Sequence, residues 1–348
     1  MPSVEYHLSH IIIPLTFFGN ILLKKFYNLK MQIALFLVFF FFALSNTSWA
    51  THAVVGSGIG QTGPITTITA PTLPKNKWVF EMQTEFLKFD EFSDDELRKF
   101  AENDEDVHSV QSLLNTSLGI GYGITDNFDL SVKIPYIIRS NIKESHHDEP
   151  EEIHRHGDAK GIGDLSILGR YRFVRLQNMD FESALLFGMK VPTGTTTDKD
   201  ISGERFEAEF QPGSGSWDLM GGFALTKRFA NLSLDANILY TVVTEGMQNT
   251  DLGDAFNYNV ALSHHTFEKP ISWDLIMEIN GIWREKQEID GRKDNNSGGN
   301  ITFLSPGVRF SWHQLTAYFS IGVPVIQNMN GIQNDTDIRL AGGISVAF

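Results

Sequence analysis

The feature that most constrains the fold of this chain is a strict alternation of apolar and polar residues over long segments. In the last twelve residues, apolar or small side chains at even positions from Ile338 to Phe348 alternate with Asp337, Arg339 and other polar or small residues. Successive side chains of a β-strand point to opposite faces, so a period of two predicts strands and argues against helices. We therefore expect an all-β protein whose strands each have one apolar face.

Twelve such segments follow one another along the chain. They lie near 76–90, 109–124, 127–142, 161–176, 180–193, 217–229, 231–245, 254–267, 271–285, 300–312, 314–325 and 337–348. The connections after even-numbered segments are short, as at Thr125-Asp126, whereas those after odd-numbered segments are mostly long and polar. This arrangement is typical of bacterial outer-membrane proteins. The expected fold is an antiparallel transmembrane β-barrel of about 12 strands, with periplasmic termini and long extracellular loops.

A soluble β-sandwich is the alternative fold. Strands of such domains usually have about 5–6 residues, about half the length of these segments. A strand of the longer kind, tilted by about 45°, crosses a bilayer. Aromatic residues gather near the strand ends, as in the interface girdles of membrane barrels: Trp78, Phe128, Tyr136, Trp217, Trp273, Trp283 and Trp312. Both observations favour the barrel.

The segment 300–312 departs from the regular pattern. Its apolar positions are odd at Ile301 and Phe303 but even at Val308 and Phe310, and Pro306 lies between them. Proline cannot donate a ladder hydrogen bond and collects at bulges. We therefore expect a β-bulge at Pro306.

The N-terminal region resembles an export signal. Residues 33–44 form an uninterrupted apolar run, and Ser48 and Ala50 fit the small-x-small pattern of a signal-peptidase site. Translation could start at Met31 instead of Met1, and a membrane anchor over 31–50 is the alternative. We expect cleavage near Ala50 and location in the outer membrane of a Gram-negative bacterium. The expected organisation is a signal peptide at 1–50, a flexible periplasmic or plugging lead-in at 51–75, and the barrel at 76–348.

Composition excludes several classes of function. The chain has no cysteine, which excludes disulfide scaffolds, thiolate metal sites and cysteine nucleophiles. Its net charge of −14 argues against a nucleic-acid partner. No serine, histidine and acid occur in a recognisable nucleophile motif, so we expect neither an enzyme nor a cofactor.

With the apolar face turned to lipid, the other face of each strand would line a polar lumen. The charged residues of this face carry both signs, so a strong preference for one ion charge is not expected. They could line a pore, or could pair across a small lumen and only hold the barrel together. These lumen candidates are Glu81, Glu85, Lys133, Arg170, Arg172, Lys190, Asp218, Asp235, Asp274, Glu278, Arg309 and Arg339.

Two long loops have distinctive compositions. In the first, which is strongly acidic, Ser93 and Glu96 have the spacing of a capping box, so we expect a short helix over the barrel mouth. The second, 146–158, combines four histidines with five carboxylates. Imidazole and carboxylate together bind divalent transition metals, although a solvated outer loop would have the same composition. The candidate metal ligands are His146, His147, His154 and His156.

Four stretches resemble one family of membrane barrels. They are Gly119–Asn127 (GIGYGITDN), Gly157–Phe173 (GDAKGIGDLSILGRYRF), Lys190–Gly194 (KVPTG) and Gln211–Asp218 (QPGSGSWD). The family is named for the "MetA-pathway of phenol degradation" and is often labelled transporter. The resemblance implies an outer-membrane protein that passes small, often hydrophobic or aromatic, molecules. The motif glycines could equally serve tight backbone turns at the barrel rim.

The sequence thus predicts an outer-membrane channel for the passive diffusion of small solutes. One alternative is a metal-related outer-membrane protein that binds divalent cations through the histidine-rich loop, and another is a closed structural barrel. The expected partners are outer-membrane lipid, small solutes and the barrel assembly machinery, which would recognise the terminal strand ending in Phe348.

Overall fold

The computed structural model describes residues 64–266 and 271–348. The chain divides into two compact units, residues 1–53 and 54–348, and the described residues all belong to the second. The predicted signal peptide, the first part of the lead-in (51–63) and the turn at 268–270 lie outside the described residues.

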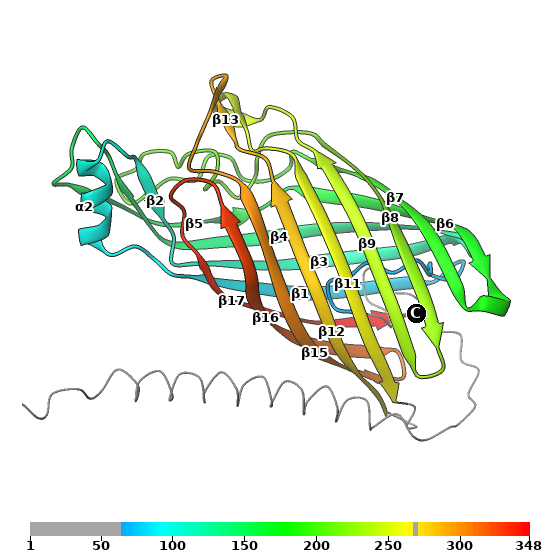
Figure 1. Ribbon diagram of the computed structural model, residues 1–348. Coiled ribbons are helices and arrows are strands. Elements are labelled where there is room, and N and C mark those ends of the chain that lie inside the picture. The colour runs from blue at the N-terminus through cyan, green and yellow to red at the C-terminus, as the bar shows by residue number, and fades with distance from the viewer. Residues whose placement is uncertain (1–63, 267–270) are drawn as a thin grey trace, which may run out of the picture. The chain divides into compact units, whose positions relative to one another are not determined.

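The second unit is a closed barrel of twelve antiparallel strands (Figure 1). Each strand pairs with its neighbours in the chain, and β1 closes the barrel by pairing with both β3 and β17. The predicted fold class is confirmed. The strands are β1 (Trp78–Phe89), β3 (Ser112–Thr125), β4 (Phe128–Ser145), β6 (Leu165–Leu176), β7 (Phe181–Val191), β8 (Asp218–Phe229), β9 (Leu232–Val242), β11 (Ala255–Thr266), β12 (Ile271–Arg284), β15 (Gly299–Trp312), β16 (Leu315–Met329) and β17 (Thr336–Ala347).

The barrel is polar inside and apolar outside. Glu278 and Asp235 are almost fully buried, whereas Trp78, Trp312 and Phe348 are about half exposed. In a soluble protein this distribution would be costly, but a membrane barrel turns its apolar face to lipid and hydrogen-bonds its backbone between strands. The alternation in the sequence therefore specifies which side of each strand faces the lipid.

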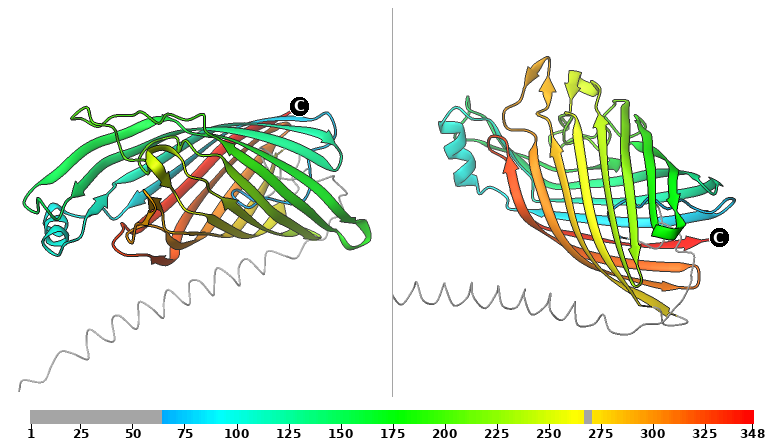
Figure 2. Two further views of the ribbon diagram at one scale, coloured as in Figure 1. Left: turned by 90° about the horizontal axis from the view of Figure 1, so that it is seen from above. Right: turned by 45° about the vertical axis from the view of Figure 1, so that its right-hand side comes forward.

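Short elements gather at the long-loop end of the barrel (Figure 2). The helix α2 (Asp94–Glu102) starts with the predicted capping box, because the Glu96 N–H donates to Ser93 Oγ and the Ser93 N–H donates to Glu96 Oε2. It packs against β4 and against two further strands, β2 (Val107–Ser109) and β5 (Ile153–Ile162). The other short elements at this end are β10 (Thr250–Asp251), β13 (Glu288–Ile289), β14 (Arg292–Lys293) and the 3-10 turn η2 (Met247–Asn249), whereas the 3-10 turn η1 (Gln177–Met179) forms the short connection between β6 and β7 at the opposite end. None of the described helices is long and apolar enough to span a membrane.

Residues 143–160, which lie between the predicted strand segments 127–142 and 161–176 and were expected to form a long loop, are mostly strand. The first half of β4 pairs with β6, and its second half pairs with β5, which continues into β6 after a break at Gly163-Asp164. This places the histidines of 154 and 156 on a hairpin that extends the barrel wall.

The bulge predicted at Pro306 is wrong. The pairing of β15 with β12 runs unbroken through Pro306, and the register shift lies between Thr302 and Phe303, where Val325 is the extra residue on β16. The apparent change of phase has another cause, because Phe303 points inward and is 5% exposed. Its ring lies 5.5 Å from the guanidinium of Arg339, a contact that compensates for an aromatic side chain in a polar interior.

Candidate functional site

The described part of the lead-in, residues 64–74, passes through the interior of the barrel. The backbone N–H groups of Ile65, Thr66 and Thr67 donate to the carboxylate of Glu278 at 2.9–3.1 Å. Further along, the Leu73 N–H donates to Asp129 Oδ2 at 2.6 Å. Within the described residues 64–74, the lead-in pairs with no strand, so buried side chains of the wall accept from its amides.

A cavity of about 340 Å³ remains between the lead-in and the wall. Its volume is at the lower end of the range of small-molecule pockets. Most of the lining residues are of polar types, but apolar atoms contribute much of the exposed surface, with apolar patches at Ile65, Ile68, Leu168 and Met220. Its polar groups can contact a hydrated ion, and its apolar patches can contact a small aromatic molecule.

Five of the predicted lumen residues line this cavity: Glu81, Glu85, Lys133, Arg309 and Arg339. They are hydrogen-bonded, since Arg339 Nε donates to Glu85 and Arg309 Nη2 donates to the carbonyl of Pro64 at 2.6 Å. Lys133 Nζ donates to Gln83 Oε1 at 2.8 Å. Among these five residues, only Arg339 and Glu85 form an ion pair, but the two carboxylates and three cationic groups of the lining nearly balance, so the net charge in the cavity is small.

The other lumen candidates are held by specific partners in the wall. Arg170 forms a buried ion pair with Asp129 at 2.6 Å, and Arg172 forms one with Glu182 at the same distance. Glu278 anchors the lead-in. Asp235 accepts from Thr226 and Ser233, Asp274 contacts His265, and Lys190 lies beside Asp164 and Asp218.

Three of the four family-like stretches meet at one place, which we call the motif junction: Asp164, Lys190, Gly194, Gly213, Ser214, Ser216 and Asp218. Asp164 Oδ1 accepts from the Gly194 N–H at 2.9 Å, and Oδ2 accepts from the N–H and hydroxyl of Ser214. Asp218 accepts from Ser216 Oγ and from Lys190 Nζ. Each of the four carboxylate oxygens thus has a donor, and the junction holds the ends of the connection 192–217.

The backbones of the motif junction approach too closely for a side chain. A Cβ on Gly194 would lie 2.6 Å from Gly213 Cα and 2.8 Å from the carbonyl carbon of Gly163. These motif glycines are explained by packing of one backbone against another.

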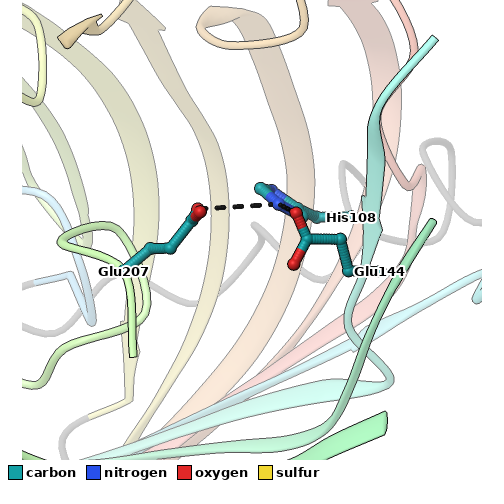
Figure 3. A group of neighbouring side chains, drawn as sticks. All are labelled: His108, Glu144 and Glu207. Carbon is teal, nitrogen blue, oxygen red and sulfur yellow. Dashed lines mark hydrogen bonds and ion pairs between the residues drawn. The ribbon is translucent and has the colours of Figure 1, made fainter. Parts of the chain in front are cut away.

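A second polar group lies at the long-loop end, and we call it the mouth cluster: His108, Glu144, His146, His156, Glu207 and Glu209. Glu144, near the end of β4, lies among three imidazoles. Its Oε1 is 2.8 Å from His108 Nε2 and 3.4 Å from His146 Nε2, and its Oε2 is 3.1 Å from His156 Nε2. Figure 3 shows the side chains of Glu144 and Glu207 both directed at the His108 ring.

Two histidines of the mouth cluster each bridge two carboxylates. His108 contacts Glu144 through Nε2 and Glu209 through Nδ1, both at 2.8 Å. His156 contacts Glu144 through Nε2 and Asp200 through Nδ1. A neutral imidazole donates from only one nitrogen, so each ring must carry a second proton or hold a cation in its place.

The electrostatics agree with this geometry. Burial would lower the pKa of His108, but Glu209 and Glu144 together raise it well above the ordinary histidine value. The pKa of Glu207 is raised by burial and by the carboxylates of Glu144 and Glu209. Excess negative charge is therefore concentrated at the mouth cluster.

The structure brings together only some of the histidines predicted as metal ligands. His146 and His156 contact Glu144, and the ring of His154 lies 5.1 Å from that of His146. His147 instead contacts Asp106 at 3.0 Å. Sequence reasoning missed His108, Glu144, Glu207 and Glu209, because these residues lie on separate segments with no common local motif.

Comparisons with known proteins agree with the fold. The structure of the COG4313 outer membrane channel from Pseudomonas putida F1 is similar at a TM-score of 0.57 and 14% identity, covering 80% of this chain and 98% of that chain. A NanC porin (TM-score 0.42, 8% identity, 77% and 98% covered) and the CymD monoaromatic hydrocarbon channel (0.40, 9%, 85% and 99%) are too distant to add to the argument. Identities this low show a shared fold.

One of two sequence comparisons identifies a family. A search of curated protein sequences found no match. A family model described as "Putative MetA-pathway of phenol degradation" matches residues 106–327, which is more than half of the chain.

Proposed function

Because the chain belongs to the family described as "Putative MetA-pathway of phenol degradation", we propose that it is an outer-membrane channel for the passive diffusion of small solutes. The observation that carries this proposal is the 340 Å³ cavity left between the lead-in and the barrel wall. The lead-in narrows the lumen, so the channel admits only small molecules.

The lining supports a broad choice of solute. Its nearly balanced charges predict weak ion selectivity, and its apolar patches at Leu168 and Met220 give small aromatic molecules a surface to contact. Aromatic cargo is also what the family name suggests. The proposed substrate class is therefore small, uncharged and partly apolar.

Single-channel recording of the mature protein in a planar bilayer tests the proposal. The wild-type protein should show a small, steady conductance with weak ion selectivity, and phenol should reduce the current as it enters the lumen. In the variant Glu278→Ala, the lead-in loses the acceptor of three N–H groups. Its conductance should be larger and noisier.

The variant Asp337→Asn is the matched control, because Asp337 forms only an exposed ion pair with Lys88 at 3.2 Å. Its conductance should equal that of the wild type. If the protein is folded but neither the wild type nor Glu278→Ala conducts, the channel proposal is contradicted. The closed structural barrel would then be the remaining interpretation. A conducting protein whose current phenol does not alter would contradict the aromatic cargo alone.

A further inference from the structure

We infer that the mouth cluster binds one divalent transition-metal ion, with His108 Nε2, Glu144 Oε1 and Glu207 Oε2 as its ligands. These three side chains offer ligand atoms that all lie within 4.8 Å of one another. His108 Nε2 is 2.8 Å from Glu144 Oε1 and 3.5 Å from Glu207 Oε2. Around a tetrahedral zinc ion with bonds of about 2.1 Å, neighbouring ligand atoms lie about 3.4 Å apart. The separation of His108 Nε2 from Glu207 Oε2 already matches this spacing, and His108 Nε2 and Glu144 Oε1 need to move apart by about 0.6 Å to reach it.

Outer carboxylates orient His108 as a metal ligand requires. Its Nδ1 is 2.8 Å from Glu209 Oε1, and the other oxygen of Glu209 accepts from Gln287 Nε2 at 2.7 Å. A carboxylate on the distal nitrogen fixes the tautomer of a metal-bound imidazole and raises its basicity. With Nδ1 engaged in this way, Nε2 is the nitrogen that faces Glu144 and Glu207.

A second histidine lies beside the three proposed ligands. His146 Nε2 lies 3.4 Å from Glu144 Oε1, which is the spacing of neighbouring ligands. His156 lies on the other oxygen of Glu144 at 3.1 Å, and Asp200 holds its Nδ1 at 2.9 Å. His156 orients the Glu144 carboxylate. His146 is not one of the three residues whose ligand atoms all lie within 4.8 Å of one another, so it completes the coordination only after its side chain moves toward the ion.

The donor set selects the class of metal. Imidazole nitrogen combined with carboxylate oxygens suits Zn²⁺ and similar first-row ions, whereas Ca²⁺ and Mg²⁺ favour oxygen ligands alone. The Glu144 side chain is 8% exposed and that of Glu207 is 53% exposed, so the group is enclosed on one side and open to solvent on the other. An ion can thus enter from outside the barrel.

The ligands come from segments far apart in the chain, namely β2, the end of β4 and the connection 192–217. A bound ion would join these segments across the barrel mouth. This role does not depend on permeation, so a failure of the channel proposal would not contradict the metal site, and the reverse is also true.

Zinc titration of the tag-free, full-length protein, stripped with a chelator, tests the inference. Competition with a chromophoric zinc indicator should show one tight site per chain that excess Ca²⁺ does not displace. His108→Ala should abolish the site, and Glu207→Gln should weaken it by at least about 10-fold. Glu209→Gln, which removes only the outer carboxylate, should lower the affinity by about 10–100-fold.

Two histidine variants serve as controls. His147→Ala changes a neighbouring exposed residue whose partner is Asp106, and His313→Ala changes one on a short turn at the opposite end. Neither should alter zinc affinity. Glu207 is half exposed, so Glu207→Gln should fold even if His108→Ala does not.

Proteolysis gives a second readout. Zinc should slow tryptic cleavage after the exposed residues Lys199 and Arg205 in the wild type but not in Glu207→Gln. Absence of a tight site, or a site that survives in Glu207→Gln and His108→Ala, would overturn the inference. Equal loss of affinity in His147→Ala would do the same, because it would indicate diffuse binding to the histidine-rich surface.

Discussion

The motif junction and the mouth cluster both combine buried carboxylates with basic groups, yet they differ in the source of their donors. In the motif junction, backbone N–H groups, hydroxyls and Lys190 serve every oxygen of Asp164 and Asp218. In the mouth cluster, the partners of Glu144 are imidazoles, whose protons can be exchanged for a metal ion. A saturated network of fixed donors holds a fold together, whereas imidazoles shared between carboxylates leave room for a cation.

The largest expected effect is a loss of folding stability when the hydrogen-bond network of the motif junction is disrupted. Asp164→Ala leaves Lys190 with one carboxylate fewer and removes the acceptor of Gly194 and Ser214. Removing one partner of a buried pair costs about 3–5 kcal/mol. Because Lys190 is partly exposed and keeps Asp218, we expect a loss near the lower end, about 3 kcal/mol. Urea unfolding of the refolded barrel measures it.

The exposed loop residue Asp148 provides the control. Asp148→Ala should change the free energy of unfolding by no more than about 0.5 kcal/mol. If the two variants unfold at the same urea concentration, the motif junction does not hold the fold together.

The next largest effect concerns zinc and the mouth cluster. Zinc at about 100 times its dissociation constant should stabilise the wild-type barrel by about 2.7 kcal/mol, because it binds only the folded state. His108→Ala should show no such gain, whereas Asp164→Ala should keep it. Urea unfolding with and without zinc separates the two regions, and a zinc gain that persists in His108→Ala would place the ion elsewhere.

Close packing in the motif junction predicts a smaller loss. Gly194→Ala forces a methyl group against the backbone of Gly213, which cannot rotate away as a side chain could. Overpacking of this kind costs about 1–3 kcal/mol. In Gly221→Ala, the new Cβ would meet nothing within 4 Å, and stability should stay within about 0.5 kcal/mol of the wild type. Equal unfolding midpoints for the two variants would contradict the packing explanation.

The barrel could be predicted from the sequence because lipid imposes a simple rule on every strand. The apolar face of each strand must point outward, so the pattern survives in segments as far apart as β1 and β17. The helix α2 was also predictable, since Ser93 and Glu96 carry their signal within one turn. The bulge at Pro306 was predicted wrongly because an inward aromatic such as Phe303 looks the same in a sequence as an outward one.

The mouth cluster could be predicted only in part. His146 and His156 lie in one conspicuous histidine-rich stretch, but His108 and Glu207 come from segments that only the closed barrel brings together. The lead-in gave no periodic signal, and in its described part the N–H groups of Ile65, Thr66 and Thr67 bond to the Glu278 side chain instead of to a neighbouring strand. Sequence patterns report local repetition, whereas these contacts are long-range and occur once.

The smallest expected effect tests whether the mouth cluster depends on the helix beside it. Ser93→Ala removes the capping hydroxyl of α2 and should destabilise the helix by about 1 kcal/mol. Amide exchange at Glu96 and Leu97 should become faster, whereas exchange in the barrel strands should not change, because α2 is not part of the strand ladder. Zinc affinity should be unchanged, since no proposed ligand lies on α2. If α2 frays and zinc affinity falls in the same variant, α2 would instead be part of the metal site.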